Sequence, residues 1–242
     1  MQRNIKALIV VPENNTTMGP EISALCPALA PIPVARVKRP ARTLLLEDLP
    51  AYGDATLAAI APFAAEQFDL VIYGCTVAGF LGGPAGNVRM VEKLRERTGA
   101  TVVSTAGAMI DALRHEGVTN TAVVTPYLQP VNDGLRDYLQ SSGIAVETLN
   151  SFFCKTTAEL GQITEEQVLD LALRTVTPQS KSLFVACSQL PTLNAMAELR
   201  AQLDIPVWSS IQATAWAGAR ADRPGFAGTI QSSSMMGRPW TT

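Results

Sequence analysis

The chain alternates short apolar runs with longer amphipathic stretches from end to end. Apolar runs of strand length lie at 5–11, 69–74, 101–104, 120–125, 182–186 and 206–209. Between them, the spacing of apolar positions predicts helices at 54–67, 88–98, 106–116, 130–142, 164–176, 192–203 and 211–221. Strands that are apolar on both faces and alternate with helices are typical of parallel sheets covered by helices. The pattern therefore predicts an α/β fold with parallel sheets.

The pattern also repeats along the chain. The segment "DLVIYGCT" resembles "SLFVACSQ", because each is an apolar strand that ends in a small residue, a cysteine and a hydroxyl residue. The segment "TGATVVSTAGAMIDAL" likewise resembles "LDIPVWSSIQATAWAG". Asn15 and Cys75 are 60 residues apart, and so are Tyr127 and Cys187. The repeat predicts two similar halves, each with a polar residue after its first strand and a cysteine after a later one.

Two similar halves also indicate where a ligand binds. We expect one lobe to comprise 1–110 and 211–242 and the other to comprise 111–210, both Rossmann-like and related by a pseudo-twofold axis. In open α/β sheets, ligands bind beyond the carboxyl ends of the strands. The two sets of strand ends then face each other, so we expect the active site in the cleft between the lobes. Cys75 and Cys187 should flank this cleft, within about 10 Å of each other.

Composition and charge exclude several classes of partner. The chain has 242 residues, 47% of them hydrophobic, and a formal net charge of −2. This balance gives no electrostatic footprint for nucleic acid. The basic run 36–42 is interpreted as a solvated loop, and segment 36–48 as a candidate lid over the site. Apolar runs are too short for a signal peptide or a membrane span, so we expect a cytoplasmic protein that contacts no membrane. Whether it forms a homo-oligomer is left open.

The four cysteines and the single histidine do not have metal-ligand spacing. Cys26 and Cys154 are interpreted as structural. Cys75 and Cys187 each follow an apolar strand and precede an expected helix start, where free N–H groups stabilise a thiolate. A thiol and a thiolate on opposite faces of a small substrate can add sulfur to it or move a proton. Neither scheme needs a cofactor, and we expect none.

Polar residues next to the expected cleft suit a small carboxylate substrate. Amides and hydroxyls of "PENNTT" and "TPY" follow the first strand of each half and can bind a carboxylate without a buried charge. The alternative for "NNTT" is an ordinary turn with a helix cap. Backbone N–H groups expected to stabilise developing negative charge belong to Thr76, Val77, Ser188 and Gln189.

Four segments in order, "VVPENNTT", "GCTVA", "VVTPYLQP" and "ACSQLPTL", resemble the Asp/Glu racemase superfamily. Within it, the chain is most similar to the branch of maleate cis–trans isomerases and arylmalonate decarboxylases. The resemblance implies an isomerase of a small dicarboxylate, in which Cys75 adds to an alkene and Cys187 protonates the neighbouring carbon. It also implies that Asn15 and Tyr127 bind the substrate, and Thr157 stands where the isomerases have an asparagine.

Other functions stay open at this point. A racemase of a small carboxylic acid, an amino acid or a hydantoin would use both thiols for proton transfer. A lyase like arylmalonate decarboxylase would need only Cys187, and that enzyme resembles the second half but has glycine in place of Cys75. A non-catalytic binding protein for a small acid would tolerate loss of both cysteines.

Overall fold

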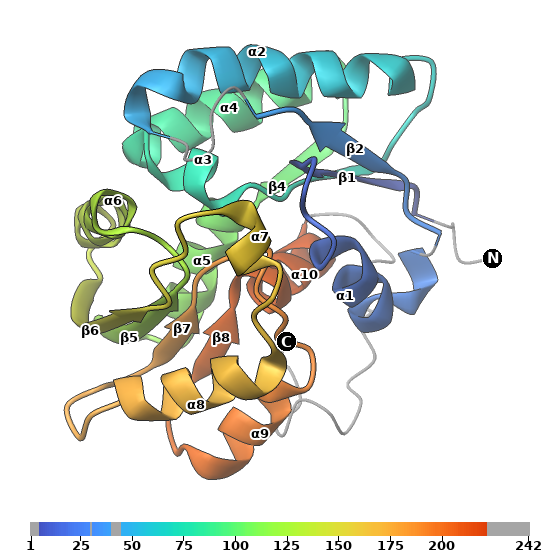
Figure 1. Cartoon of the computed structure of the whole chain (residues 1–242). Helices are drawn as coiled ribbons and strands as arrows, with labels where there is room; N and C mark the ends of the chain where they lie inside the picture. Colours follow the sequence, from blue (N-terminus) through green and yellow to red (C-terminus); the bar gives the residue numbers. More distant parts are fainter. Residues whose placement is uncertain (1–4, 30, 40–44, 222–242) are drawn as a thin grey trace.

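The computed structural model describes residues 5–29, 31–39 and 45–221. Within them, two four-stranded parallel sheets are flanked by helices (Figure 1). The first sheet, in the order β2-β1-β3-β4, contains β1 (Ala7–Pro12), β2 (Val34–Val37), β3 (Leu70–Tyr73) and β4 (Thr101–Ser104). The second, in the order β6-β5-β7-β8, contains β5 (Asn120–Thr125), β6 (Ala145–Ser151), β7 (Leu183–Val185) and β8 (Val207–Ser209). The predicted α/β fold with parallel sheets is confirmed.

Helices cover the outer faces of both sheets and fill the space between them. Figure 1 places α2 and α4 outside the first sheet and α8 and α9 outside the second. The helices α5 and α10 pack against each other where the halves meet. The bounds are α1 (Met18–Leu25), α2 (Leu49–Ile60), α3 (Thr76–Phe80), α4 (Gly83–Thr98), α5 (Thr105–His115), α6 (Gln129–Ser141), α7 (Thr157–Leu160), α8 (Glu165–Thr175), α9 (Ala195–Gln202) and α10 (Ser210–Arg220).

The central strands form the core, as their apolar sequences predict. Every residue of β1, β3 and β7 is buried, and so is all of β5 except its first residue. Side chains on both faces of these strands pack against helices, so a polar residue within them would lose its solvation. Eight of the nine predicted site residues follow the carboxyl ends of these four strands, and Thr157 begins α7, after the edge strand β6.

The two halves have the same construction. Their strand orders are equivalent, and helices that begin directly after the fourth strand of each sheet are capped in the same way. The Ser104 hydroxyl accepts a hydrogen bond from the N–H of Gly107 at 3.0 Å, and the Ser209 hydroxyl accepts one from Gln212 at 3.2 Å. The internal repeat is therefore structural. The lobe boundaries expected from it stay a prediction, and residues 222–242 lie outside the described part of the chain.

Several expected bounds were wrong. The edge strands β2 and β6 were not predicted, and α2 begins at Leu49 rather than at residue 54. The basic run 36–42 is not simply a solvated loop, because Arg36 lies in β2 and donates hydrogen bonds to the carbonyls of Glu13 and Asn15. Part of the candidate lid at 36–48, residues 40–44, lies outside the described residues.

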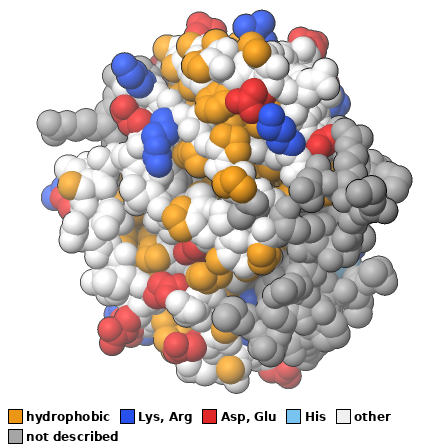
Figure 2. All heavy atoms as spheres, turned by 90° about the vertical axis from the view of Figure 1, so that its right-hand side faces the viewer, with side chains coloured by type: hydrophobic (Ala, Val, Ile, Leu, Met, Phe, Trp, Pro, Cys, Tyr) orange, Lys and Arg blue, Asp and Glu red, His pale blue; other side chains and the backbone are white. Residues whose placement is uncertain are grey.

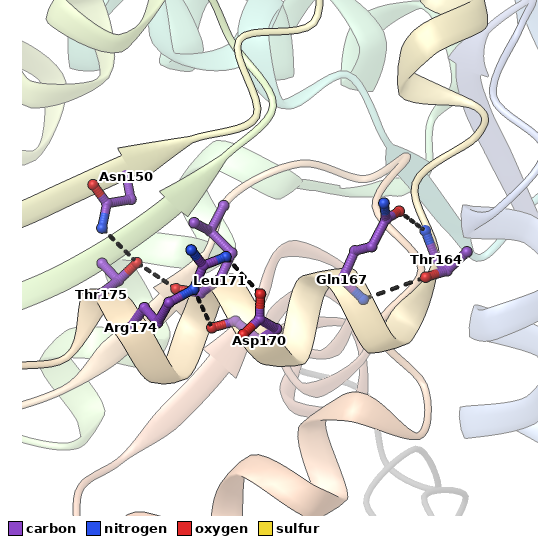
Figure 3. Close-up of polar contacts among 7 residues, drawn as sticks. All are labelled: Asn150, Thr164, Gln167, Asp170, Leu171, Arg174 and Thr175. Carbon is purple, nitrogen blue, oxygen red and sulfur yellow. Dashed lines mark hydrogen bonds and ion pairs between the residues drawn. The ribbon is translucent and has the colours of Figure 1, made fainter.

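Local signals define α8, the predicted helix at 164–176. The hydroxyl of Thr164 accepts a bond from the N–H of Gln167, whose side chain accepts one from the N–H of Thr164 (Figure 3). This reciprocal capping box fixes the first turn. At the other end, Asn150 on β6 donates to the Thr175 hydroxyl at 3.2 Å. The helix is thus held to the edge strand that the sequence pattern missed.

The surface mixes charges of both signs. On the face that Figure 2 shows, Lys and Arg side chains are interspersed with Asp and Glu side chains and with apolar groups. None of the helices in 5–29, 31–39 and 45–221 combines the length and apolar character needed to cross a bilayer.

Glu21 on α1 joins the two halves through buried hydrogen bonds. Its carboxylate accepts bonds from the N–H and the hydroxyl of Thr192, at 2.7 and 2.9 Å. Burial raises the pKa of the Glu21 carboxyl from 4.5 to about 7; the bonds from Thr192 oppose the rise and the nearby Glu165 adds to it. The native state therefore holds this proton more tightly than the unfolded chain does.

This pKa predicts a loss of stability as the pH rises. Between pH 4.5 and about 7, the free energy of unfolding should fall by roughly 3 kcal/mol through Glu21. Glu21→Gln keeps an acceptor for Thr192 and cannot ionise, so we expect it to exceed the wild type in stability by about 1–3 kcal/mol at pH 8 and to match it at pH 5. Urea unfolding at both pH values measures this, with Glu198→Gln on the exposed face of α9 as the control. An equal difference at both pH values would contradict it.

Candidate active site

One pocket lies where the carboxyl ends of β1, β3, β5 and β7 converge. Its empty volume is about 710 Å³, including the part open to solvent. All nine residues predicted from the sequence line it: Asn15, Cys75, Thr76, Val77, Tyr127, Thr157, Cys187, Ser188 and Gln189. The residues come from both sheets, so the pocket is the cleft expected between the halves.

A hydrogen bond joins the segments that carry the two cysteines. The Ser188 hydroxyl donates to the carbonyl of Gly74, so the residue after Cys187 contacts the residue before Cys75. Asn15 strengthens this junction, because its amide nitrogen donates to both the carbonyl and the hydroxyl of Ser188 at 3.1 Å. The fold thus brings together two cysteines that are 112 residues apart in the chain.

Cys75 stands at the junction of β3 and α3. Its backbone is extended, it occupies the N-cap position of the five-residue α3, and its side chain is buried. A larger residue in place of the preceding Gly74 would force Met18 and Val11 to move, because an added Cβ would lie 2.4 Å from the sulfur of Met18 and 2.7 Å from Val11. Behind the thiol stand Tyr52 and Tyr73; burial raises the pKa of both hydroxyls, and the nearby Cys75 raises it further.

Cys187 follows β7 but does not precede a helix, which corrects the sequence-based expectation. Residues 188–190 form a turn and the next helix, α9, begins at Ala195. The turn still directs the N–H of Gln189 at the Cys187 sulfur, at 3.4 Å. Burial raises the pKa of the Cys187 thiol, and the N–H groups of Gln189 and Leu190, the Tyr127 hydroxyl and Arg39 oppose the rise. Because burial is the largest of these effects, the Cys187 thiol stays protonated near neutral pH and can act as a proton donor.

Tyr127 lies beside both thiols and is rigidly held. Its carbonyl accepts bonds from Asn132 at 2.9 Å and Ser151 at 2.6 Å, and its ring packs on Phe80 with centroids 5.9 Å apart. Burial raises the pKa of its hydroxyl, and the Cys187 and Cys75 thiols raise it further. The hydroxyl is a neutral donor close to both sulfurs.

Among the neutral side chains that line the pocket, three polar atoms are buried without a hydrogen-bond partner in the described part of the chain. They are the hydroxyl oxygens of Thr76 and Tyr127 and the side-chain carbonyl of Asn14. Such a group costs stability unless a ligand or water satisfies it, and three in one pocket indicate a polar ligand.

The Asn15 side chain, expected to bind substrate, makes hydrogen bonds within the protein through both its oxygen and its nitrogen. Its side-chain oxygen accepts bonds from the N–H groups of Thr17 and Met18, which start α1, and its nitrogen binds Ser188. The turn-and-cap alternative for this segment is therefore present in the structure. A substrate carboxylate would have to share an amide that already links the two halves.

Several lining residues were not predicted. Arg39, from the basic run after β2, and Lys155 line the pocket, and no Asp or Glu of the described residues does. Cys154, interpreted from the sequence as structural, also lines it; burial raises the pKa of its thiol to about 11, with Glu159 and Cys187 adding to the rise. The repeat and the family resemblance pointed to the site, and neither includes these three residues, although Arg39 lies in the segment 36–48 interpreted as a candidate lid. No cluster of three or more His, Cys, Asp or Glu suited to a metal occurs within the described ranges.

The fold and the paired cysteines define a two-halved α/β protein with a thiol-lined site, and sequence comparison assigns it to a family. Residues 54–233 match the arylmalonate decarboxylase family, and the chain belongs to that family. The maleate isomerase of Geobacillus stearothermophilus is 25% identical over 228 residues, which cover 89% of this chain and 91% of that protein. The arylmalonate decarboxylase of Bordetella bronchiseptica is 29% identical over 160 residues, 62% of this chain and 66% of that one.

Solved structures agree with this assignment. A cysteine-to-alanine mutant of a Pseudomonas putida maleate isomerase, solved with maleate, has a TM-score of 0.82 and 26% identity and covers 91% of this chain and 93% of its own. A cysteine-to-serine mutant of the Nocardia farcinica maleate cis–trans isomerase, solved with a covalently bound succinylcysteine intermediate, has a TM-score of 0.81 and 25% identity, with 90% and 92% covered.

Proposed function

We propose that the protein is a cofactor-independent cis–trans isomerase of a small dicarboxylate, of the maleate-to-fumarate type. The observation that carries this is the pocket itself, where two thiols from equivalent strand ends meet beside unpartnered hydrogen-bonding groups and no acidic side chain among the described residues. The relatives that are maleate isomerases support the same activity.

Cys75 is the proposed nucleophile. Its thiolate adds to one alkene carbon, and the electron pair of the double bond moves toward the neighbouring carbon and its carboxylate. Cys187 donates its proton to that carbon, which leaves a succinyl group on Cys75 and a thiolate at Cys187. Rotation about the new single bond, return of a proton to Cys187 and loss of the Cys75 sulfur give the trans product. The succinylcysteine in the Nocardia farcinica relative is the intermediate that this sequence of steps contains.

Hydrogen-bond donors of the pocket stabilise the charge that forms during addition. We assign one carboxylate to the hydroxyls of Thr76 and Tyr127 together with the N–H groups at Thr76 and Val77, with Ser188 and Gln189 on the opposite side. Donors that are fixed before the reaction and shielded from water stabilise an enediolate-like charge most effectively. Asn15 and Thr157 complete the binding set, with Asn15 also holding the two halves together.

The experiment that tests this function is NMR of the protein with candidate substrates in D2O. Maleate should yield fumarate, and the rate should be unchanged after exhaustive dialysis against EDTA. Release of carbon dioxide from an arylmalonate without turnover of maleate would favour the lyase, for which the Bordetella bronchiseptica relative is the specific support. Deuterium at the α-carbon of aspartate, glutamate or a hydantoin, again without fumarate, would favour the racemase.

A further inference from the structure

The loop after β1 places a buried hydrogen-bond acceptor in the wall of the pocket. Asn14 lines the pocket, and its side-chain carbonyl oxygen is inaccessible to solvent and accepts no hydrogen bond from the described residues. The neighbouring Asn15, in contrast, uses both its oxygen and its nitrogen within the protein. A buried acceptor without a donor costs stability. The donor that satisfies Asn14 therefore has to come from a ligand or from water.

The backbone holds Asn14 in one place. The N–H of Asn15 donates to the carbonyl of Pro12 at 2.9 Å, which closes a tight turn with Asn14 as its third residue. Arg36 on β2 ties the same turn from the other side, because it donates to the carbonyls of Glu13 and Asn15 at 3.0 and 2.9 Å. The Asn14 side chain therefore starts from a fixed point on the pocket wall.

The unpartnered neutral groups of the pocket need different partners. The hydroxyls of Thr76 and Tyr127 can donate, so one ionised carboxylate can satisfy both. The Asn14 carbonyl can only accept, and so can an ionised carboxylate. A dicarboxylate without substituents therefore leaves Asn14 unsatisfied. A ligand that satisfies all three groups carries a hydrogen-bond donor in addition to its carboxylates.

The donor that fits this pocket is uncharged. Arg39 and Lys155 line the pocket, and no Asp or Glu of the described ranges does. An ammonium group would find no carboxylate of the described pocket wall to pair with, and a buried charge without such a partner is costly. A hydroxyl donates one hydrogen bond without bringing a charge, so it satisfies Asn14 at the lowest cost.

We propose that Asn14 is a specificity-determining residue that accepts a hydrogen bond from a hydroxyl group of the substrate, so that the site prefers hydroxylated dicarboxylates to unsubstituted ones. The inference rests on the proposed function, because it assumes that a carboxylate occupies the donors at Thr76 and Tyr127. A site that accepts a hydrogen bond from its substrate rejects an analogue without the donor, since the buried acceptor is then left unpaired. Maleate is still converted, and a maleate derivative that carries a hydroxyl binds more tightly.

Binding of malate and of 2-methylsuccinate tests this without requiring turnover, because the two diacids differ only in a hydroxyl that replaces a methyl group. In calorimetric titrations, the wild type should bind one enantiomer of malate about 5- to 50-fold more tightly than either enantiomer of 2-methylsuccinate. Asn14→Leu keeps the volume and removes the acceptor, so it should bring this ratio to within about twofold and leave succinate within about threefold of the wild type. Asn14→Ala should lose the preference as well, so the result does not depend on how leucine packs. The control Glu13→Gln, on an exposed neighbour that does not line the pocket, should keep the wild-type ratio.

The two hypotheses fail separately. If the wild type does not prefer malate, or if both Asn14 variants keep the preference, Asn14 does not recognise the hydroxyl, whatever maleate does. If Asn14→Leu weakens succinate as much as malate, the amide donates to a carboxylate through its nitrogen, which also overturns the proposal. If Asn14→Leu weakens malate selectively but the wild type does not convert maleate to fumarate, Asn14 recognises the hydroxyl and the isomerase is wrong.

Discussion

The Cys187→Ser variant should accumulate a covalent adduct on Cys75 when it is mixed with maleate. Cys75 still adds to the alkene, and water or the serine hydroxyl supplies the proton to the neighbouring carbon, more slowly than Cys187 does. The serine hydroxyl does not ionise near neutral pH, so it offers no base to take the proton back for elimination. Intact-mass spectrometry should show an increase equal to one maleic acid, and turnover should fall by about 10²- to 10⁴-fold. The paired Cys75→Ser variant should be nearly inactive and form no adduct, since it lacks the nucleophile.

Cys154 provides the control for this experiment, because it lines the same pocket. The double variant Cys154→Ser/Cys187→Ser should still trap the adduct, and peptide mapping should place it on the peptide that contains Cys75. If the adduct is lost when Cys154 is also replaced, Cys154 and not Cys75 is the nucleophile. If the wild type does not turn over maleate and neither single variant forms an adduct, the isomerase is wrong and the racemase becomes the favoured function.

The central strands could be predicted because they are buried on both faces of the sheet and therefore consist mainly of apolar residues. β1, β3, β5 and β7 are buried between helices, and each was found from a short run that contains consecutive apolar residues. Of the four edge strands, β4 and β8 were predicted from short apolar runs, whereas β2 and β6 were missed. β6 is half-buried along most of its length and carries polar residues such as Glu147 and Asn150, so its sequence does not differ from that of a loop.

The candidate site was predictable to the extent that it follows the repeat. Cys75 and Cys187 stand at equivalent strand ends, and the repeat placed them on one cleft. Arg39 was missed because basic runs usually lie in solvent, and nothing local to "RVKRPAR" shows that Arg36 binds the Asn15 loop. The hydrogen bonds between Asn15 and Ser188 could not be predicted either, because they join residues 173 positions apart in the chain.

Loss of the Tyr127 hydroxyl should affect activity and stability in opposite directions. Tyr127→Phe removes a buried hydroxyl that has no partner meeting hydrogen-bond geometry among the described residues. Activity on maleate should fall by about 10²- to 10³-fold, since a fixed donor to the developing charge is lost. The free energy of unfolding should be unchanged or higher by up to about 1 kcal/mol, because the folded protein no longer buries an unsatisfied polar group. Turnover assays and urea unfolding on the same preparation measure both.

Tyr138→Phe is the matched control for Tyr127→Phe. Both rings pack on Phe80, with centroids 6.4 and 5.9 Å away, but Tyr138 does not line the pocket. The control should therefore keep its activity. A Tyr127→Phe variant that is both less stable and fully active would show that the hydroxyl supports the fold. A variant that gains stability and loses activity would show that the hydroxyl serves the substrate and not the fold. The folded protein then keeps an unsatisfied group at a cost in stability, as expected where stability and activity oppose each other.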